Sequence, residues 1–278
     1  RATKSARRIL ELGGTAIDAA ISAQMVLNLV EPQSSGIGGG GFILYYDAKT
    51  KNIYAWDGRE KAPMNFSERV FLNSDGKKKG FIEAVSGGLA VGVPSLVTML
   101  EKAHEVHGNM QWKLLFEDSI KLSTEGFVVG KRLSKLTSRA PHLKNQETAR
   151  EYFNIDNGGL LEGTLKKNLQ FADTIKLIRD KGSKAMLTGE LADNILSTVT
   201  EHKSSPGLMT KKDFSFVKPA LTKPTCGKYR KWKICGMGPP SSGGITILQI
   251  LGILNNFELS SNNPNDPEVW HLFLEASK

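Results

Sequence analysis

Residues 31–46 read Glu-Pro-Gln-Ser-Ser-Gly-Ile-Gly-Gly-Gly-Gly-Phe-Ile-Leu-Tyr-Tyr, a glycine loop that runs directly into an apolar segment. This segment, a turn at 47–51 and a second strand at 52–56 predict a β-hairpin entered through the glycine loop. A phosphate-binding loop has the opposite order, because it leads from a strand into a helix whose N-terminus meets the anion. The loop also lacks a Gly-Lys-Ser/Thr ending, so we do not expect a nucleotide site.

The four consecutive glycines of this loop need a separate explanation, because each glycine loses more conformational entropy on folding than any other residue. They indicate either a sharp bend of the backbone or a neighbour that packs against bare main chain. The residues concerned are Gly38, Gly39, Gly40 and Gly41.

Two helices are predicted before the loop. Residues 2–12 place Ala6, Ile9 and Leu10 on one side of a helix, with Gly13 as its C-terminal cap. Thr15 caps a second helix over 16–30, which Pro32 terminates. Asp18 then lies in the first turn, where the helix dipole favours a carboxylate.

Arg59 follows the second strand, with Asp57 and Glu60 close in sequence. An arginine suits two-pronged binding of a carboxylate in a fixed plane, whereas a lysine offers a mobile point charge. From the residues alone, a surface arginine paired with a nearby acid is an equally good interpretation.

A second candidate segment precedes an apolar helix that extends to about residue 255. Its prolines stiffen the approach, and its serine hydroxyls and glycine N–H groups lie at the helix N-terminus, where they can bind an anion or simply cap the helix. Without further context the cap is the favoured interpretation. The segment consists of Pro239, Pro240, Ser241, Ser242, Gly243 and Gly244.

Cys226 and Cys235 are the two cysteines, too few for a disulfide scaffold. Residues 221–236 are predicted to form a hairpin. If its loop is Arg230-Lys231, the cysteines lie directly opposite each other at a non-hydrogen-bonded pair. Their Cα atoms are then roughly 4.5 Å apart, within disulfide range. A loop in another register removes this possible disulfide.

Composition and charge exclude several classes of protein. The chain has 278 residues, 40% of them apolar, which is ordinary for a globular protein. Its net charge of +9 comes from 37 basic and 28 acidic residues, spread along the chain without the arginine clusters of a nucleic-acid-binding module. No apolar run reaches the 18 or so residues of a membrane span, so we expect no membrane-spanning segment in these residues. Because residue 1 is arginine, we expect the chain to start inside a longer precursor.

The remaining pattern mixes helices and strands without the regular alternation of a doubly wound sheet. Further helices are predicted at 94–108, 110–124, 168–181 and 189–203, a short capped helix at 210–213, and a last helix from about 267. The five histidines are scattered, and the helical spacing of His104 and His107 alone does not make a metal site. We expect neither a metal nor an organic cofactor.

Taken together, these segments resemble the γ-glutamyltranspeptidase family, whose signatures appear here in the family's order over essentially the whole chain. Any one of them is weak evidence, but five in order are strong. They are Gly-Gly-Thr-Ala-Ile-Asp-Ala-Ala at 13–20, Glu31-Pro32 followed by the glycine loop, Arg-Glu-Lys-Ala-Pro at 59–63, Gly-Gly-Leu-Ala-Val-Gly-Val-Pro at 87–94, and Pro-Pro-Ser-Ser-Gly-Gly at 239–244.

The resemblance implies an α/β (α+β) protein with the αββα sandwich of the N-terminal-nucleophile hydrolases. Members are precursors (zymogens) that cut themselves into a large and a small subunit, which form a heterodimer. The threonine at the new N-terminus of the small subunit attacks the γ-glutamyl amide, with its own α-amine as the implied base. The acyl-enzyme then passes to water or to an amino acid or peptide.

This sequence departs from the family pattern at both ends. It contains no Thr-Thr-His or Thr-Ser-His, as expected at the cut, and Thr200-Glu201-His202 lies inside a predicted helix. We therefore expect residues 1–278 to be one domain, most of a large subunit that lacks the extreme N-terminus, the large-subunit tail and the small subunit. The chain alone then contains no catalytic residue.

Carried over residue by residue, the resemblance matches Arg59 to the arginine that binds the α-carboxylate of the γ-glutamyl group, with Glu60 and Asp57 as possible support. The four loop glycines are then close-packed backbone behind the substrate pocket, and 239–244 is a stiff segment near the subunit interface. The implied partners are the small subunit, glutathione or another γ-glutamyl substrate, and water or an amino acid or peptide acceptor. Nucleic acid is not among them.

Alternatives remain open. A poly-γ-glutamate capsule depolymerase shares the nucleophile chemistry, and cephalosporin acylases are more remote. A truncated, non-catalytic member is a non-enzymatic alternative. Because bacterial members are commonly exported, the resemblance also implies a periplasmic or secreted protein.

Overall fold

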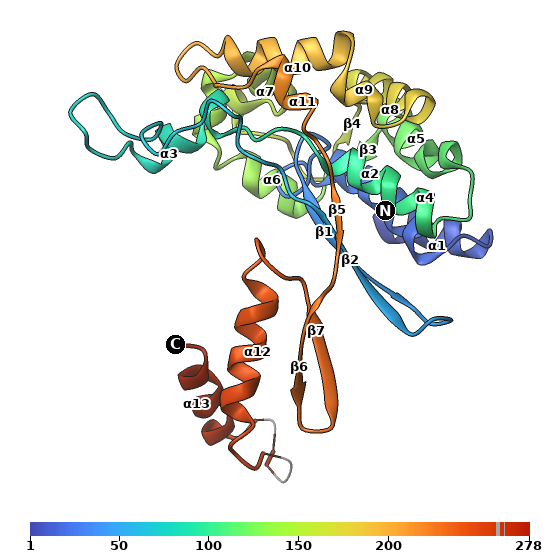
Figure 1. The fold of residues 1–278 in the computed structure, drawn as a ribbon. Helices are drawn as coiled ribbons and strands as arrows, with labels where there is room; N and C mark the ends of the chain where they lie inside the picture. Colours follow the sequence, from blue (N-terminus) through green and yellow to red (C-terminus); the bar gives the residue numbers. More distant parts are fainter. Residues whose placement is uncertain (260–261, 264) are drawn as a thin grey trace. The chain divides into compact units, whose positions relative to one another are not determined.

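The computed structural model describes residues 1–259, 262–263 and 265–278 (Figure 1). By its contacts the chain divides into two compact units. The first comprises residues 1–41 and 58–219, and the second comprises 42–57 and 220–278. Each unit is described here by itself.

The first unit is mostly helical, with one short two-stranded sheet (Figure 1). Its helices are α1 (Ala2–Glu11), α2 (Ala16–Val30), α3 (Phe81–Val85), α4 (Leu96–His107), α5 (Glu117–Glu125), α6 (Lys131–Thr137), α7 (Glu147–Tyr152), α8 (Leu169–Lys181), α9 (Lys184–Leu187), α10 (Glu190–Thr200) and α11 (Lys211–Phe214). Its strands are β3 (Phe127–Val128) and β4 (Leu165–Lys166), which pair antiparallel.

The predicted helix at 16–30 is confirmed as α2, and its N-terminus shows why it starts there. The Thr15 hydroxyl accepts from the N–H of Asp18, and the Asp18 carboxylate accepts from the N–H of Thr15 in return. Asp18 is fully buried and also accepts from the N–H groups of Asn109 and Met110, so it joins two segments rather than only facing the helix dipole. Gly13 follows α1 with φ +88°.

One part of the α1 prediction is wrong. Ile9 is buried, as expected, but Leu10 is 51% exposed and the second buried position of α1 is Ser5. A polar residue can take this position because the Ser5 hydroxyl lies 2.7 Å from the Ser22 hydroxyl of α2 and donates to Asp118 of α5. Hydrogen bonding, rather than apolar periodicity alone, therefore sets the buried face of α1.

Two apolar clusters are part of the core of the first unit, each built from segments distant in sequence. Burying one such side chain contributes about 1.5–3 kcal/mol relative to leaving it exposed. One cluster consists of Leu29, Phe127, Val129, Leu133 and Leu160. The other consists of Val93, Ala192, Val199, Met209 and Phe214.

The second unit contains a three-stranded sheet and a separate hairpin (Figure 1). Its elements are β1 (Gly41–Asp47), β2 (Asn52–Gly58), β5 (Ala220–Thr222), β6 (Thr225–Tyr229), β7 (Trp232–Gly236), α12 (Gly243–Leu254) and α13 (Pro267–Ala276). The sheet has the order β1-β2-β5, with β5 antiparallel to β2 and Trp56 opposite Leu221. The predicted strand pair at 42–46 and 52–56 is thus present and slightly longer.

The predicted hairpin at 221–236 is correct only from residue 225 onward. Leu221 belongs to β5 and pairs with β2, whereas β6 and β7 form the hairpin by themselves. Pro224 separates the two strands, because proline has no N–H to donate to a sheet ladder. The chain can therefore leave one strand partner and take another at this point.

Helix α12 packs against the β6–β7 hairpin through glycines. A Cβ on Gly227 would lie 2.9 Å from Leu248, and a Cβ on Gly236 would lie 2.6 Å from the Cα of Gly244. Several large apolar side chains of this unit are nevertheless exposed, and six of them lie on α12 and α13. They are Ile245, Ile247, Ile253, Trp270, Phe273 and Leu274.

The fold class is therefore mixed helix and strand, as expected. The four-layer sandwich and the single-domain interpretation of 1–278 stay predictions. Among the described residues, no helix is long and apolar enough to cross a membrane.

Candidate functional site

The glycine loop is hydrogen-bonded to the N-terminus of α4. The carbonyl oxygen of Gly39 accepts from the N–H groups of Ser95 and Leu96, at 3.0 and 2.9 Å. These are among the donors that a helix leaves unsatisfied at its first turn, so the loop serves as the cap. The Ser95 hydroxyl donates to the carbonyl of Gly58, which immediately precedes Arg59. One helix start thus fixes both the glycine loop and the backbone before Arg59.

Arg59 and Glu60 form an ion pair next to this loop. The Arg59 Nε donates to the Glu60 Oε1 at 3.0 Å, and the two side chains are 52% and 32% exposed. A guanidinium has five N–H donors in one plane. The bond from Nε therefore sets the orientation of that plane while the head group remains accessible from solvent.

The Glu60 side chain passes between two glycines. A Cβ on Gly40 would collide with the Glu60 carboxylate and with the backbone of residues 58 and 60. A Cβ on Gly92 would lie 2.7 Å from the Glu60 Cγ. Neither position has room for a larger residue, so this close approach explains both glycines without any unusual backbone angle.

Two more glycines of the site pack against α4. A Cβ on Gly58 would lie 2.8 Å from the Met99 Sδ, and a Cβ on Gly41 would be in ordinary contact with Leu96 and Met99. The prediction of closely packed backbone therefore holds at Gly40 and partly at Gly41. Gly38 has no atom within 4 Å of a Cβ built on it, and nothing in the structure explains that glycine.

The chain after Arg59 is held by a bridge and a buried carboxylate. The N–H of Val93 donates to the carbonyl of Lys61, and the N–H of Met64 donates to the Asp213 carboxylate at 2.8 Å. Burial raises the pKa of Asp213, but hydrogen bonds from Met64 and Thr210 outweigh it and lower the pKa below its ordinary value. Asp213 is thus a carboxylate anchor for the segment that carries Arg59.

Asp57 and the segment at 239–244 belong to the second unit. Asp57 lies in β2 opposite Ala220. The peptide between Pro239 and Pro240 is cis, and Ser242 occupies the N-cap position of α12 without a capping hydrogen bond from its side chain. Ser242 therefore takes the predicted cap position, but its hydroxyl does not supply the capping hydrogen bond. Gly244 packs on the backbone of Gly236 and Met237.

The sequence prediction missed the residues that support Arg59 from a distance: Ser95, Gly92, Met99 and Asp213. Gly92 and Ser95 flank Val93-Pro94, a segment already noted for its glycines, so a signal existed at that point. Nothing in the sequence indicated which residues would pack against it, because the contacts join positions more than thirty residues apart.

A second polar cluster lies between α1 and α5, beside a cavity of about 970 Å³ lined by residues of those helices. Arg8 and Ser5 both donate to the Asp118 carboxylate, at 2.9 and 2.7 Å. The cluster contains a carboxylate already bound by two donors and no nucleophile–base pair. It holds the two helices together.

Comparison with known proteins places the chain in a family. The sequence model described as gamma-glutamyltranspeptidase matches residues 2–278. The chain is 38% identical to the glutathione hydrolase proenzyme of Bacillus subtilis over 268 residues, which are 96% of this chain and 45% of that protein. It therefore spans less than half the length of this curated relative.

Solved structures agree with this similarity. The γ-glutamyltranspeptidase of Helicobacter pylori superposes with a TM-score of 0.93 at 31% identity, covering 99% of this chain and 78% of that chain. The Bacillus anthracis transpeptidase CapD shares the fold, with a TM-score of 0.79 at 24% identity over 99% of this chain and 86% of that chain. The chain belongs to the γ-glutamyltranspeptidase family.

Proposed function

We propose that this chain is most of the large-subunit portion of an autoprocessing γ-glutamyl hydrolase and transferase. Its substrates are glutathione and related γ-glutamyl compounds. The observation that carries the proposal is the Arg59–Glu60 pair, accessible from solvent and fixed beside the glycine loop. The naming of the Bacillus subtilis relative as a glutathione hydrolase supports the substrate class.

In the proposed reaction, a threonine hydroxyl outside this chain attacks the γ-carbonyl carbon, with the threonine's own amine as base. The amide C–N bond breaks, the leaving amine takes the proton, and a γ-glutamyl ester forms on the threonine. Water or the amine of an acceptor then attacks the ester and restores the hydroxyl. This chain supplies substrate positioning rather than the reacting atoms.

Arg59 is the proposed binding residue for the substrate α-carboxylate. A planar guanidinium matches a carboxylate with two parallel N–H···O bonds, which fix both distance and direction. Because the γ-carbonyl is connected to that carboxylate through a short chain, holding one end restricts where the other end lies. Such orientation lowers the entropic part of the barrier.

Glu60 is the proposed positioning residue for Arg59. It holds the guanidinium at Nε, and its own side chain is fixed between Gly40 and Gly92. We further propose that the glycine loop lies behind the substrate pocket, and that the segment at 239–244 lies near the contact with the small subunit. The exposed apolar residues of α12 support such a contact.

The test uses the full-length gene product, with Arg59→Ala and the charge-retaining Arg59→Lys. Charged hydrogen bonds contribute about 1.5–3 kcal/mol each, so kcat/KM for a chromogenic γ-glutamyl anilide should fall about tenfold or more in both variants. Self-cleavage, followed on a denaturing gel, should continue. Arg69→Ala is the matched control, an exposed arginine of the same unit. Unchanged kinetics for Arg59→Ala would remove this residue from the site.

The alternatives are separable. A poly-γ-glutamate depolymerase, as the CapD fold neighbour permits, should prefer long γ-linked polymers to glutathione, whereas the proposed enzyme should prefer the small substrate. A non-catalytic member should neither cleave itself nor release product. We also propose a periplasmic or secreted location, which the disulfide between Cys226 and Cys235 supports, since such bonds persist in oxidising compartments.

A further inference from the structure

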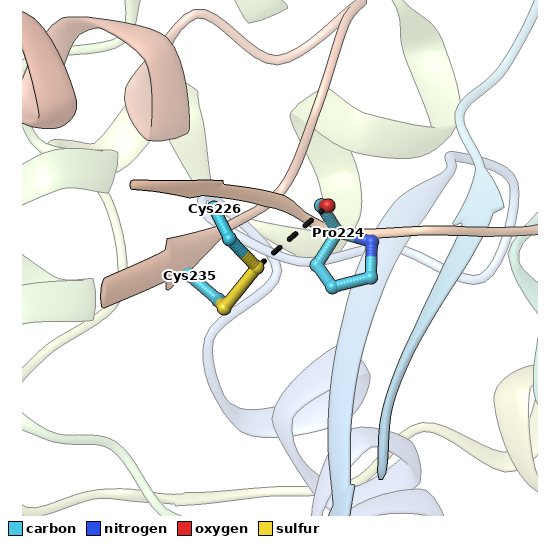
Figure 2. The surroundings of a disulfide bond; sticks show 3 residues. All are labelled: Pro224, Cys226 and Cys235. Atoms are coloured by element: carbon cyan, nitrogen blue, oxygen red, sulfur yellow. Dashed lines mark hydrogen bonds between the residues drawn. A yellow bond between two sulfur atoms is a disulfide. The ribbon is translucent and has the colours of Figure 1, made fainter. Parts of the chain in front are cut away.

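The β6–β7 hairpin joins its strands by a disulfide. Cys226 lies directly opposite Cys235, and a disulfide joins the two residues (Figure 2). Their Cα atoms are 4.1 Å apart, and the loop between the strands is Arg230-Lys231. Besides the cysteine pair, four residue pairs share the hairpin register, from Thr225 opposite Gly236 to Tyr229 opposite Trp232. The disulfide is thus not needed to define which strands pair or how.

The two faces of this hairpin differ. Because side chains alternate along a strand, Gly227 and its partner Ile234 share the face that packs on α12, where Leu248 approaches Gly227. The disulfide is on the opposite face, and Cys226 is exposed. Its Sγ lies 3.8 Å from the carbonyl oxygen of Pro224, a van der Waals contact because a disulfide sulfur carries no hydrogen (Figure 2).

The same face carries two lysines. Lys228 and Lys233 are a directly opposed pair, each two residues from a cysteine on its own strand, so their side chains share the face of the disulfide. Both are exposed. Within the part of the chain that the structure describes, neither forms an ion pair with a carboxylate. Positive charge beside a cysteine favours the thiolate form and attracts anionic reactants.

We propose that the Cys226–Cys235 disulfide is a redox modification site, opened by small thiols that carry a negative charge. The thiolate of the small molecule attacks the exposed Cys226 Sγ, forming a mixed disulfide while Cys235 leaves as a thiolate. A second thiolate attacks the small molecule's sulfur and releases Cys226. Overall, two small thiols are oxidised to one disulfide, and the protein disulfide is reduced to two thiols. The two protons that the small thiols lose end on the two cysteines.

Opening this bond has a local consequence. Gly236 follows Cys235 and packs directly on Gly244, in the first turn of α12. The oxidised hairpin therefore restrains the backbone that supports α12, and reduction releases one end of that restraint. The chemistry uses neither Arg59 nor a γ-glutamyl group, so it stands or falls separately from the proposed enzymatic function.

The test measures reduction of the folded full-length protein by three thiols of similar size. The probes are 3-mercaptopropionate, 2-mercaptoethanol and cysteamine, which are anionic, neutral and cationic and contain no γ-glutamyl amide. Reactions are quenched by alkylation, and the disulfide is counted by intact mass. Each thiol is compared between the wild type and Lys228→Ser/Lys233→Ser, so differences in intrinsic thiol reactivity cancel.

We expect the lysine double variant to react about two- to sixfold more slowly with 3-mercaptopropionate, as Coulomb's law gives in water for the loss of one or two unit charges about 8 Å away. Its rate with 2-mercaptoethanol should be unchanged, and its rate with cysteamine should rise. High salt should reduce these differences. The matched control, Lys181→Ser/Lys184→Ser in the other unit, should behave as the wild type.

Two results would overturn the proposal. One is a disulfide that millimolar thiol opens only after the protein is unfolded in urea, which identifies a purely structural bond. The other is a set of reduction rates for the anionic, neutral and cationic thiols that is the same in the lysine variant as in the wild type. An Arg59→Ala protein should give the same reduction rates as the wild type, which separates this inference from the proposed substrate binding.

Discussion

At Arg59, the important feature is how many separate segments fix one exposed side chain. Its plane is set by Glu60, which in turn passes between Gly40 and Gly92. The backbone before it is held by Ser95. For the substrate-binding role proposed for Arg59, this positioning matters because a misplaced binding group orients its ligand less well. The position of the Arg59 guanidinium therefore depends on Gly40 and Gly92, because they leave room for Glu60.

Substitution of Gly92 by alanine tests this dependence. The new methyl group would lie 2.7 Å from the Glu60 Cγ, and overpacking of this kind typically costs about 1–3 kcal/mol. In the full-length protein we expect Gly92→Ala to lower kcat/KM for γ-glutamyl substrates, with self-cleavage retained.

A double variant shows whether the effect passes through Glu60. Gly92→Ala added to Glu60→Ala should produce little further loss, because substitutions of residues in contact are not additive and the Glu60 Cγ, the closest contact of the new methyl group, is gone. Gly80→Ala is the control, since a Cβ there meets no atom within 4 Å. Additive losses would show that Gly92 acts by another route.

The sequence alone was enough to propose Arg59 and the glycine loop as site residues, but not to predict their surroundings. The resemblance matched the arginine residue by residue, and local spacing gave its distance from the hairpin. The residue that faces both Gly40 and Gly92 could not be predicted, because these contacts depend on the path of the chain between 40 and 92. The helical spacing of apolar residues also gave a wrong prediction at Leu10, which is exposed. The hydrogen bond between the buried residues Ser5 and Ser22 determines the buried face of that helix instead.

Among the secondary-structure elements, short helices and strands held by polar anchors were the hardest to predict. The capped turn at 210–213 was expected and is α11, but its role in holding Met64 was not. Likewise Leu221 was assigned to the wrong strand partner, because a strand of three residues carries no periodicity with which to choose. In both cases a long-range contact decides the outcome.

The stability that Asp213 of α11 contributes should depend on pH. Its folded-state pKa lies below the ordinary value, so its contribution to stability is present above about pH 4 and is lost as pH falls through the folded pKa. Asp213→Asn should therefore lower the free energy of unfolding by about 1–2 kcal/mol at pH 7. The difference from the wild type should shrink below pH 4. Urea unfolding of the same full-length protein at several pH values measures both quantities.

Asp193→Asn is a suitable control for this experiment. The Asp193 carboxylate of α10 forms an exposed ion pair with Lys211, which lies in α11 together with Asp213. Exposed pairs contribute about 0–1 kcal/mol. A stability difference for Asp213→Asn that does not change between pH 7 and pH 3 would contradict the anchoring role.

For the molecule as a whole, the exposed apolar side chains of α12 and α13 are the main observation. An amphipathic helix normally turns its apolar residues toward a core, yet Ile247 and Leu274 are each more than half exposed. Exposed apolar patches of this kind mark contact surfaces. Together with the length of the relatives, they support the proposal that another segment covers this face.

Production of residues 1–278 alone, compared with the full-length gene product, tests this interpretation. We expect the shorter protein to be poorly soluble and to bind a hydrophobic dye strongly, whereas the full-length protein should be soluble. Ile247→Lys and Leu274→Lys should improve the solubility of the short form and impair assembly of the long form. Lys substitutions that leave full-length assembly intact would show that these residues face solvent in the assembled protein.

The passage of Glu60 between Gly40 and Gly92 also constrains how this sequence can drift over evolutionary time. A larger residue at 40 meets backbone and cannot be accommodated by any side-chain change, so that position is fixed as long as the loop keeps its path. At position 92 the closest contact is the Glu60 Cγ at 2.7 Å, whereas the Glu60 Cβ and the Lys61 carbonyl oxygen are farther away, at 3.1 and 3.3 Å. This position is therefore less restricted once residue 60 becomes small. Descendants that abandon the arginine–glutamate pair should therefore lose the glycine at 92 first and keep the one at 40.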